Sequence, residues 1–249
     1  MSNETGVVAV ERDGTVVDAG WTRGLDETLD WMEANAGAEA FAMVDAPLVV
    51  TNAVGQRACE KQTGQRYGKW KVSANSTNLN SRNLGGQELR LLLEQRGWSY
   101  SAGWSGPPAK GRHFSECYPF TALVGAAELG YDEERPVYKR KPKAMATSEF
   151  RPLRAAVCDD LLARLDALAV ADPPLRLRSH PVTAALLDEK SPIVDAAYKH
   201  REDLVDAAIC AWTGLLWLQH GLERCQVLGE DEQASGATII APARPSQRR

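Results

Sequence analysis

Hydrophobic and polar residues alternate along the first part of the chain with the two-residue period of β-strands. The pattern over 6–21 predicts a β-hairpin, because two apolar runs flank the turn signal Asp13-Gly14. An apolar stripe with acidic residues in its first turn predicts a helix over 25–36. The apolar run over 38–45 predicts a buried strand that ends before a proline.

Later in the chain the apolar positions follow helical spacing, and the region 55–112 is the least regular. The remaining predicted elements are a helix over 87–97, a strand over 113–118, helices within 120–129, 149–170 and 193–219, and a strand or loop over 237–242. This order indicates an α/β or α+β layered domain with a mixed β-sheet flanked by helices. We expect a single domain over 1–243 and a disordered tail over 244–249.

Composition places the chain among ordinary globular proteins. Its 249 residues suffice for one sizeable domain. No apolar stretch is long enough to span a membrane, and the first residues lack the pattern of a secretory signal. The five cysteines are scattered without the spacing of a zinc ribbon, so we expect reduced thiols and a cytoplasmic location.

The charge of the chain is unevenly distributed. The net charge is −4, but residues 55–112 carry ten Lys or Arg and three Glu, so this segment is +7 and the remainder is −11. A basic insertion of this kind suggests an anionic partner such as RNA or DNA. The candidate phosphate ligands are Lys69 and Lys71 in this segment and Lys139 in a later basic loop. The alternative is a solvated surface with long cationic side chains. The absence of G-x-x-x-x-G-K-[ST] and G-x-G-x-x-G motifs gives no support to nucleotide-triphosphate or dinucleotide binding.

Four carboxylates carry the candidate chemistry. Asp45 closes the predicted strand over 38–45, Glu116 lies within a second short strand, and Asp203 and Asp206 are one turn apart on the longest helix. A carboxylate in an apolar strand is costly to bury unless it is paired or binds a metal. Several such groups at one point would form a site for Mg²⁺ or Mn²⁺, which indicates metal-assisted phosphodiester chemistry.

Each carboxylate also has a structural interpretation. Asp45 could cap the following turn, and Glu116 could lie on an ordinary edge strand. For Asp203, an exposed pair with Arg201 or Lys199 is the simpler interpretation, whereas Asp206 adjoins an alanine-rich, buried part of the helix and favours function.

Short motifs spread over the whole chain resemble those of a known family. They lie at 44–48, 57–60, 115–119, 138–139, 203–207 and 236–240. In order and spacing the chain is similar to the predicted RNase H-like nucleases catalogued as domain of unknown function 429. The resemblance implies an RNase H-like fold, with Asp45 matching the acid of the fourth strand, Asp203 or Asp206 that of the last helix, and Glu116 a further acidic position.

One departure from the family pattern concerns the N-terminus. Family members open with a central strand that carries a G-[IV]-D motif, and this strand and its Asp have no counterpart here. We therefore expect a shortened gene product that lacks one metal ligand, with reduced stability and activity.

These observations lead to a functional hypothesis. We expect a divalent-metal-dependent phosphodiesterase on nucleic acid, in which Asp45, Glu116 and Asp206 hold one or two Mg²⁺ or Mn²⁺ ions and Arg57 and Lys139 neutralise phosphate. The rival hypothesis is a non-catalytic nucleic-acid-binding or scaffold protein on the same fold. A phosphatase of small phosphorylated molecules is a third possibility.

Overall fold

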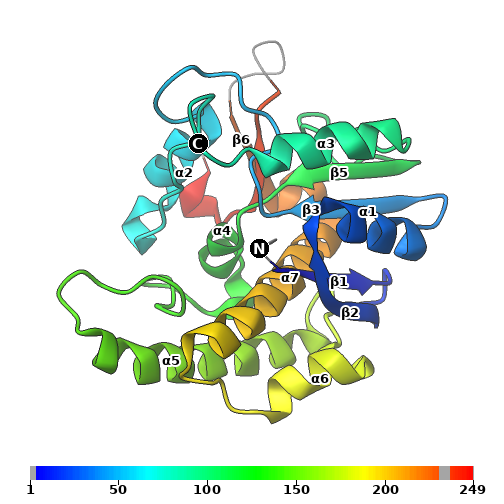
Figure 1. Ribbon diagram of the computed structural model, residues 1–249. Helices are drawn as coiled ribbons and strands as arrows, with labels where there is room; N and C mark the ends of the chain where they lie inside the picture. The colour runs from blue at the N-terminus through cyan, green and yellow to red at the C-terminus, as the bar shows by residue number, and fades with distance from the viewer. Residues whose placement is uncertain (1–3, 230–235, 249) are drawn as a thin grey trace.

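The structure, a computed structural model, describes residues 4–229 and 236–248 and has a mixed α/β architecture (Figure 1). The strands are β1 Glu4–Val10, β2 Val16–Arg23, β3 Ala40–Val44, β4 Ser99–Tyr100, β5 Arg112–Glu116, β6 Cys225–Leu228 and β7 Ile239–Pro242. The helices are α1 Gly24–Asn35, α2 Ala58–Tyr67, α3 Gly85–Gln95, α4 Pro119–Gly125, α5 Thr147–Ala167, α6 Pro181–Asp188 and α7 Asp195–His220.

The strands form three small sheets. β1 and β2 make an antiparallel hairpin, β3, β5 and β4 make a parallel sheet in the order β3-β5-β4, and β6 pairs antiparallel with β7. An isolated bridge between Cys117 and Ile240 connects the second sheet to the third. The parallel sheet with helices around it confirms the α/β layered class expected from the sequence. The expected single mixed sheet is wrong, because the described strands form one parallel and two antiparallel sheets.

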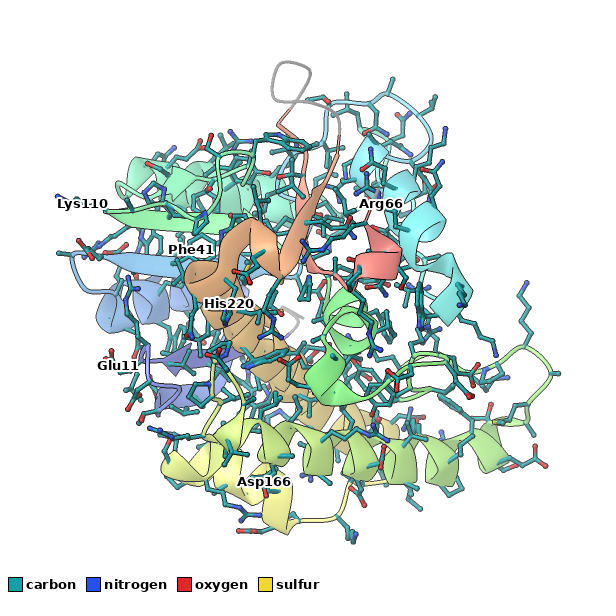
Figure 2. The ribbon with its side chains drawn as sticks, turned by 180° about the vertical axis from the view of Figure 1, so that it is seen from behind. Glu11, Phe41, Arg66, Lys110, Asp166 and His220 are labelled. Carbon is teal, nitrogen blue, oxygen red and sulfur yellow. The ribbon has the colours of Figure 1, made fainter. Side chains whose placement is uncertain are left out.

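Helix α7 is the structural centre of the molecule. It contacts β1 and β3, so one helix joins the hairpin to the parallel sheet, and it crosses the molecule beside both (Figures 1 and 2). Its small and apolar residues explain this position, since most of the helix from Leu204 to Trp217 is buried. The backbone of β1 lies so close that a Cβ on Gly6 would come within 2.2 Å of the carbonyl oxygen of Asp203.

Two hydrophobic clusters lie on opposite faces of β3, which follows from the alternation of side chains along a strand. Phe41 and Met43 pack against the larger cluster, which α7 shares with α4, α5, β6 and β7. Ala42 and Val44 pack against the smaller cluster, which is built mainly from α1 and α3. The segment 55–112 therefore helps to form the core, because it supplies α3 and the edge strand β4.

Several elements differ from the expectations. The sequence pattern missed α2, α6, β4 and β6, which are short or lack a clear period. The tail expected to be disordered is ordered up to residue 248, since Pro245–Gln247 forms a 3₁₀ turn and Gln247 is buried with its amide donating to the carbonyl of Val124 at 3.1 Å. Within the described residues, no helix has the length and apolarity needed to cross a membrane.

Within the described residues, no strand joins the hairpin to the parallel sheet. β1 and β3 are both edge strands, and a cleft of about 1500 Å³ is lined by residues of both. We call the part of this cleft between β1 and β3 the inter-sheet groove.

The close contact between α4 and β7 yields a stability prediction. A Cβ on Gly125, the last residue of α4, would lie 1.9 Å from the carbonyl oxygen of Pro242. Because backbone would have to move, Gly125→Ala should lower the free energy of unfolding by about 3 kcal/mol. Chemical denaturation of the variant and the wild type measures this change.

A matched variant in another helix provides the control. A Cβ on Gly64, within α2, would meet no atom within 4 Å, so Gly64→Ala should raise the free energy of unfolding by up to about 1 kcal/mol. Equal effects of the two substitutions would contradict the close contact between α4 and β7.

Candidate functional site

Asp45 lies at the C-terminal end of β3, where the chain leaves the parallel sheet. Its side chain is exposed to the cleft. The carboxyl ends of parallel strands are where α/β proteins place their sites. Residues of α7, among them Asp206 and Cys210, line the same cleft, so the end of β3 faces the middle of that helix.

Asp206 is buried on α7 and is held by two residues of one loop. The hydroxyl of Tyr138 donates to its Oδ1 at 2.8 Å, and the ammonium group of Lys139 pairs with its Oδ2. Tyr138 is itself fixed, because its carbonyl accepts from the hydroxyl of Tyr198 at 2.6 Å. The loop residues therefore hold the Asp206 carboxylate in a defined orientation.

The electrostatics of the site centre on Asp45. Desolvation by surrounding protein atoms, together with the nearby charges of Asp206 and Glu116, raises the pKa of Asp45 to about 7, against the opposing charge of Lys139. Burial of the Lys139 ammonium lowers its pKa, but the negative charges of Asp206 and Asp45 outweigh this effect and raise the pKa of Lys139 above its ordinary value. Asp45 is therefore an accessible carboxyl group. The positive charge of Lys139 offsets only part of the free-energy cost of ionising it.

Glu116, at the end of β5, is part of a closed ionic network. Both of its oxygens accept from Arg57, at 2.7 and 2.6 Å, and one also accepts from the backbone N–H of Leu48 at 2.9 Å. Arg57 in turn donates to Glu60 at 2.9 Å and to the carbonyl of Val49 at 3.2 Å. Burial raises the pKa of Glu116, and the bidentate bonds from Arg57 oppose that rise.

This network determines how Arg57 and Glu116 can act. The Arg57 side chain is 3% exposed and its donors are engaged, so nearly all of its surface faces other protein groups. Glu116 holds the N–H of Leu48, three residues after Asp45, and so anchors the turn that carries Asp45. The structure thus brings Glu116 close to Asp45 as a support, and its role as a direct metal ligand stays a prediction.

The remaining predicted residues lie at or outside the edge of the site. Asp203 pairs with Lys199 one turn earlier, as its structural interpretation anticipated, and burial raises the pKa of Asp203. Lys71 pairs with Glu134, and the Lys69 ammonium lies 5.5 Å from the centre of the Trp70 ring. Among the described residues, Lys69 and Lys71 are not part of the cleft lining, and their role in binding phosphate stays a prediction.

The donor set suits a metal that is shared with a substrate. Asp45 and Asp206 offer carboxylate oxygens, and Mg²⁺ is commonly bound by one or two carboxylates together with water and substrate phosphates. In the part of the chain that the structure describes, no group of three or more His, Cys, Asp or Glu side chains is placed to hold a metal ion. The binding of Mg²⁺ or Mn²⁺ by Asp45 and Asp206 therefore stays a prediction.

Sequence reasoning missed three contributors to the site. Glu60 lies three residues after Arg57. This spacing on a helix could have indicated the ion pair between the two side chains. Tyr138 adjoins Lys139, but no periodic pattern showed which way its side chain points. Strand alternation placed Tyr118 on the same side as Glu116, but it did not show that Tyr118 lines the cleft.

Comparison with known proteins identifies a family. The family described as "Protein of unknown function (DUF429)" matches residues 2–234. No curated protein and no solved structure matches the chain.

The raised pKa of Asp45 predicts an unusual dependence of stability on pH. An Asp in an unfolded chain titrates near 3.9, whereas Asp45 in the folded protein titrates near 7. The folded state therefore binds the extra proton between about pH 4 and 7, and stability should fall as pH rises through this range. Asp45→Asn should raise the melting temperature at pH 8, and this gain should vanish near pH 4.

Asp195 offers a control with the opposite sign. Hydrogen bonds from Arg151 and Arg154 lower the pKa of Asp195, so Asp195→Asn should reduce the melting temperature at pH 8. Thermal melts over pH 4–8 measure both variants. A gain for Asp45→Asn that does not depend on pH would show that Asp45 titrates normally.

The buried ionic network predicts non-additive substitutions. Glu116→Leu or Arg57→Met alone leaves an uncompensated buried charge, which should cost about 3–5 kcal/mol of unfolding free energy. The double variant should lose less than the sum of the two, because each removes the other's unpaired partner. Urea denaturation of the three variants gives the coupling energy, and simple additivity would mean that the pair does not interact.

Proposed function

Because the chain belongs to the DUF429 family, whose description assigns no activity, we propose a function from the site itself: divalent-metal-dependent hydrolysis of phosphodiesters in nucleic acid. The observation that carries the proposal is the accessible Asp45 carboxyl group, which faces the buried Asp206 and the cationic Lys139 at one end of a large cleft. Such a group with a perturbed pKa in a cleft is typical of functional sites.

We assign the metal contacts to Asp45 and Asp206. When bound, Mg²⁺ or Mn²⁺ would supply an activated water and would neutralise charge on the phosphate. Asp45 is accessible and repelled by neighbouring carboxylates, so a cation beside it would relieve that repulsion. Tyr138 keeps the Asp206 carboxylate oriented, and Glu116 supports the turn that carries Asp45.

Cationic and aromatic residues beside the carboxylates suit a nucleic-acid substrate. Lys139 remains charged and lies within the cleft, where it can pair with a phosphate oxygen. Arg140 also lines the cleft and donates to the side-chain oxygen of Asn75 at 2.8 Å. Tyr118 offers a half-buried ring near these cations, which suits stacking with a base.

We further propose that the fold is RNase H-like. The supporting features are an opening β-hairpin, a parallel pair formed by β3 and β5, and a final long helix that carries an acidic residue beside the end of β3.

We place the protein in the cytoplasm. All five cysteines are buried as free thiols, a state that a reducing compartment preserves.

A rival function is nucleic-acid or partner binding without cleavage, which the incomplete ligand set favours. Hydrolysis of small phosphorylated molecules is a second alternative, because Asp45, Asp206 and Lys139 could serve a phosphomonoester equally well.

Cleavage assays on RNA, DNA and branched substrates test the proposal. We expect Mg²⁺- or Mn²⁺-dependent cleavage that EDTA abolishes and added metal restores. Asp45→Asn should reduce the rate on the order of a hundredfold or more, because it removes a metal contact. Mn²⁺ binding in the presence of a nucleotide, followed by electron paramagnetic resonance, should weaken in the same variant.

Asp195→Asn, on the exposed start of α7, is the matched control and should leave cleavage and metal binding unchanged. Binding without cleavage would favour the scaffold alternative, and a preference for small phosphate esters would favour the phosphatase. Cleavage that persists in EDTA would refute the metal-dependent mechanism.

A further inference from the structure

Besides the inter-sheet groove, the cleft has a second feature: two of its lining residues are cysteines whose sulfur atoms are in contact. Cys117 directly follows β5, Cys210 lies in the middle of α7, and both line the cleft. The thiol of Cys117 donates to the Sγ of Cys210 at 3.4 Å. Cys210 is 7% exposed and Cys117 3%, against 1% or less for the other three cysteines. A small oxidant in the cleft is therefore better placed to reach this pair than the other thiols.

The fold holds the two sulfur atoms within reach of one another. The residues are 93 positions apart in the sequence, so the folded chain has already closed the loop that a disulfide would close. The S–S bond of a disulfide is about 2.05 Å long, so the sulfurs need to approach by only about 1.3 Å. The pair is therefore one oxidation step away from a covalent link between the end of β5 and α7.

The two cysteines are also attached to the segments that carry the candidate acids. The backbone N–H of Cys117 donates to the carbonyl of Val44 at 3.0 Å, and Val44 directly precedes Asp45. Cys210 follows Asp206 by four positions on α7, so the two side chains lie on one face of the helix. A bond between the sulfurs would therefore act on the positions of both Asp45 and Asp206.

We propose that Cys117 and Cys210 are a redox-sensitive pair, which hydrogen peroxide converts into a reversible disulfide that joins the end of β5 to α7. Peroxide oxidises one thiol to a sulfenic acid and releases water. The second thiol then displaces the hydroxyl group of the sulfenic acid, which forms the S–S bond and releases a second water. Two electrons pass from the sulfurs to the peroxide, and a dithiol reductant returns them. Disulfides in a reducing compartment are usually transient and redox-sensing, and this pair is of that kind.

Formation of the disulfide should change the candidate site, a consequence that rests on the proposed function. Drawing the sulfurs together should shift the end of β5 against α7, and with it Asp45 against Asp206. A misplacement of about 1 Å can lower the rate of an enzyme about a hundredfold. Oxidation should therefore slow the proposed phosphodiester cleavage by about tenfold or more, and reduction should restore the rate.

Peroxide treatment of the full 249-residue chain tests the pair directly. The hydrogen bond to Cys210 and burial raise the pKa of the Cys117 thiol, so the reaction is slow and the exposure is continued overnight. After the remaining thiols have been alkylated, trypsin should release the peptide 202–224, which contains Cys210, linked to the peptide that begins at His113. Because the disulfide closes a long loop, it should raise the melting temperature by about 5 °C or more until dithiothreitol is added.

Two serine variants separate this pair from the other thiols. Cys210→Ser removes one partner, so peroxide should produce neither the cross-link nor the rise in melting temperature. Cys158→Ser, at a buried position of α5, is the matched control, and peroxide should still produce both. Each variant is compared with its own reduced form, so a lower basal stability does not affect the result. If a variant fails to fold, the peptide map of the wild type alone decides the proposal.

Cleavage assays before and after oxidation distinguish the redox pair from the proposed function. A cross-link between Cys117 and Cys210 in a protein that cleaves no substrate when reduced would support the redox pair and count against the proposed function. Absence of this cross-link after the overnight exposure, or a disulfide between other cysteines, would overturn the redox pair whatever the cleavage rate. If peroxide slows cleavage equally in the wild type and in Cys210→Ser, regulation of the site by this pair is refuted.

Discussion

The buried guanidinium group of Arg57 is the interaction on which the arrangement of the site depends. It lies between two carboxylates, Glu60 on α2 and Glu116 at the end of β5, and it also holds the carbonyl of Val49. These contacts fasten three separate segments to one cation at the point where the parallel sheet ends. Burying three charges carries a large desolvation cost, so the gain is better understood as a fixed geometry than as stability.

This fixed geometry separates the charged residues into two groups with different chemistry. Glu116 and Arg57 satisfy each other and are closed to solvent, whereas Asp45 is open to the cleft and faces Asp206 and Lys139. A carboxylate therefore lies in a closed ion pair in one place and is open to the cleft in another. The surroundings of each carboxylate, and not its residue type, set this difference in pairing and solvent access.

Much of the fold could be predicted from periodicity, because the hairpin, β3, α3 and α7 have clear two-residue or helical patterns. Short elements such as β4 and β6 could not, since a strand of two or four residues carries too little pattern. Asp45 and Asp206 could be singled out as acids in apolar surroundings. The buried ion pair between Glu116 and Arg57 could not be predicted, because the two residues lie 59 positions apart and their contact depends on tertiary structure.

The contact between the two ends of the chain has a consequence for biosynthesis. Glu4 meets His200, a partner 196 residues further along, and β1 rests on the first half of α7. A ribosome delivers the hairpin early, at about 5–20 residues per second, so the hairpin emerges many seconds before the helix that covers it. During that interval its apolar face and strand edge stay open to other nascent chains. The packing of the hairpin is thus completed only after the segment around His200 has been synthesised.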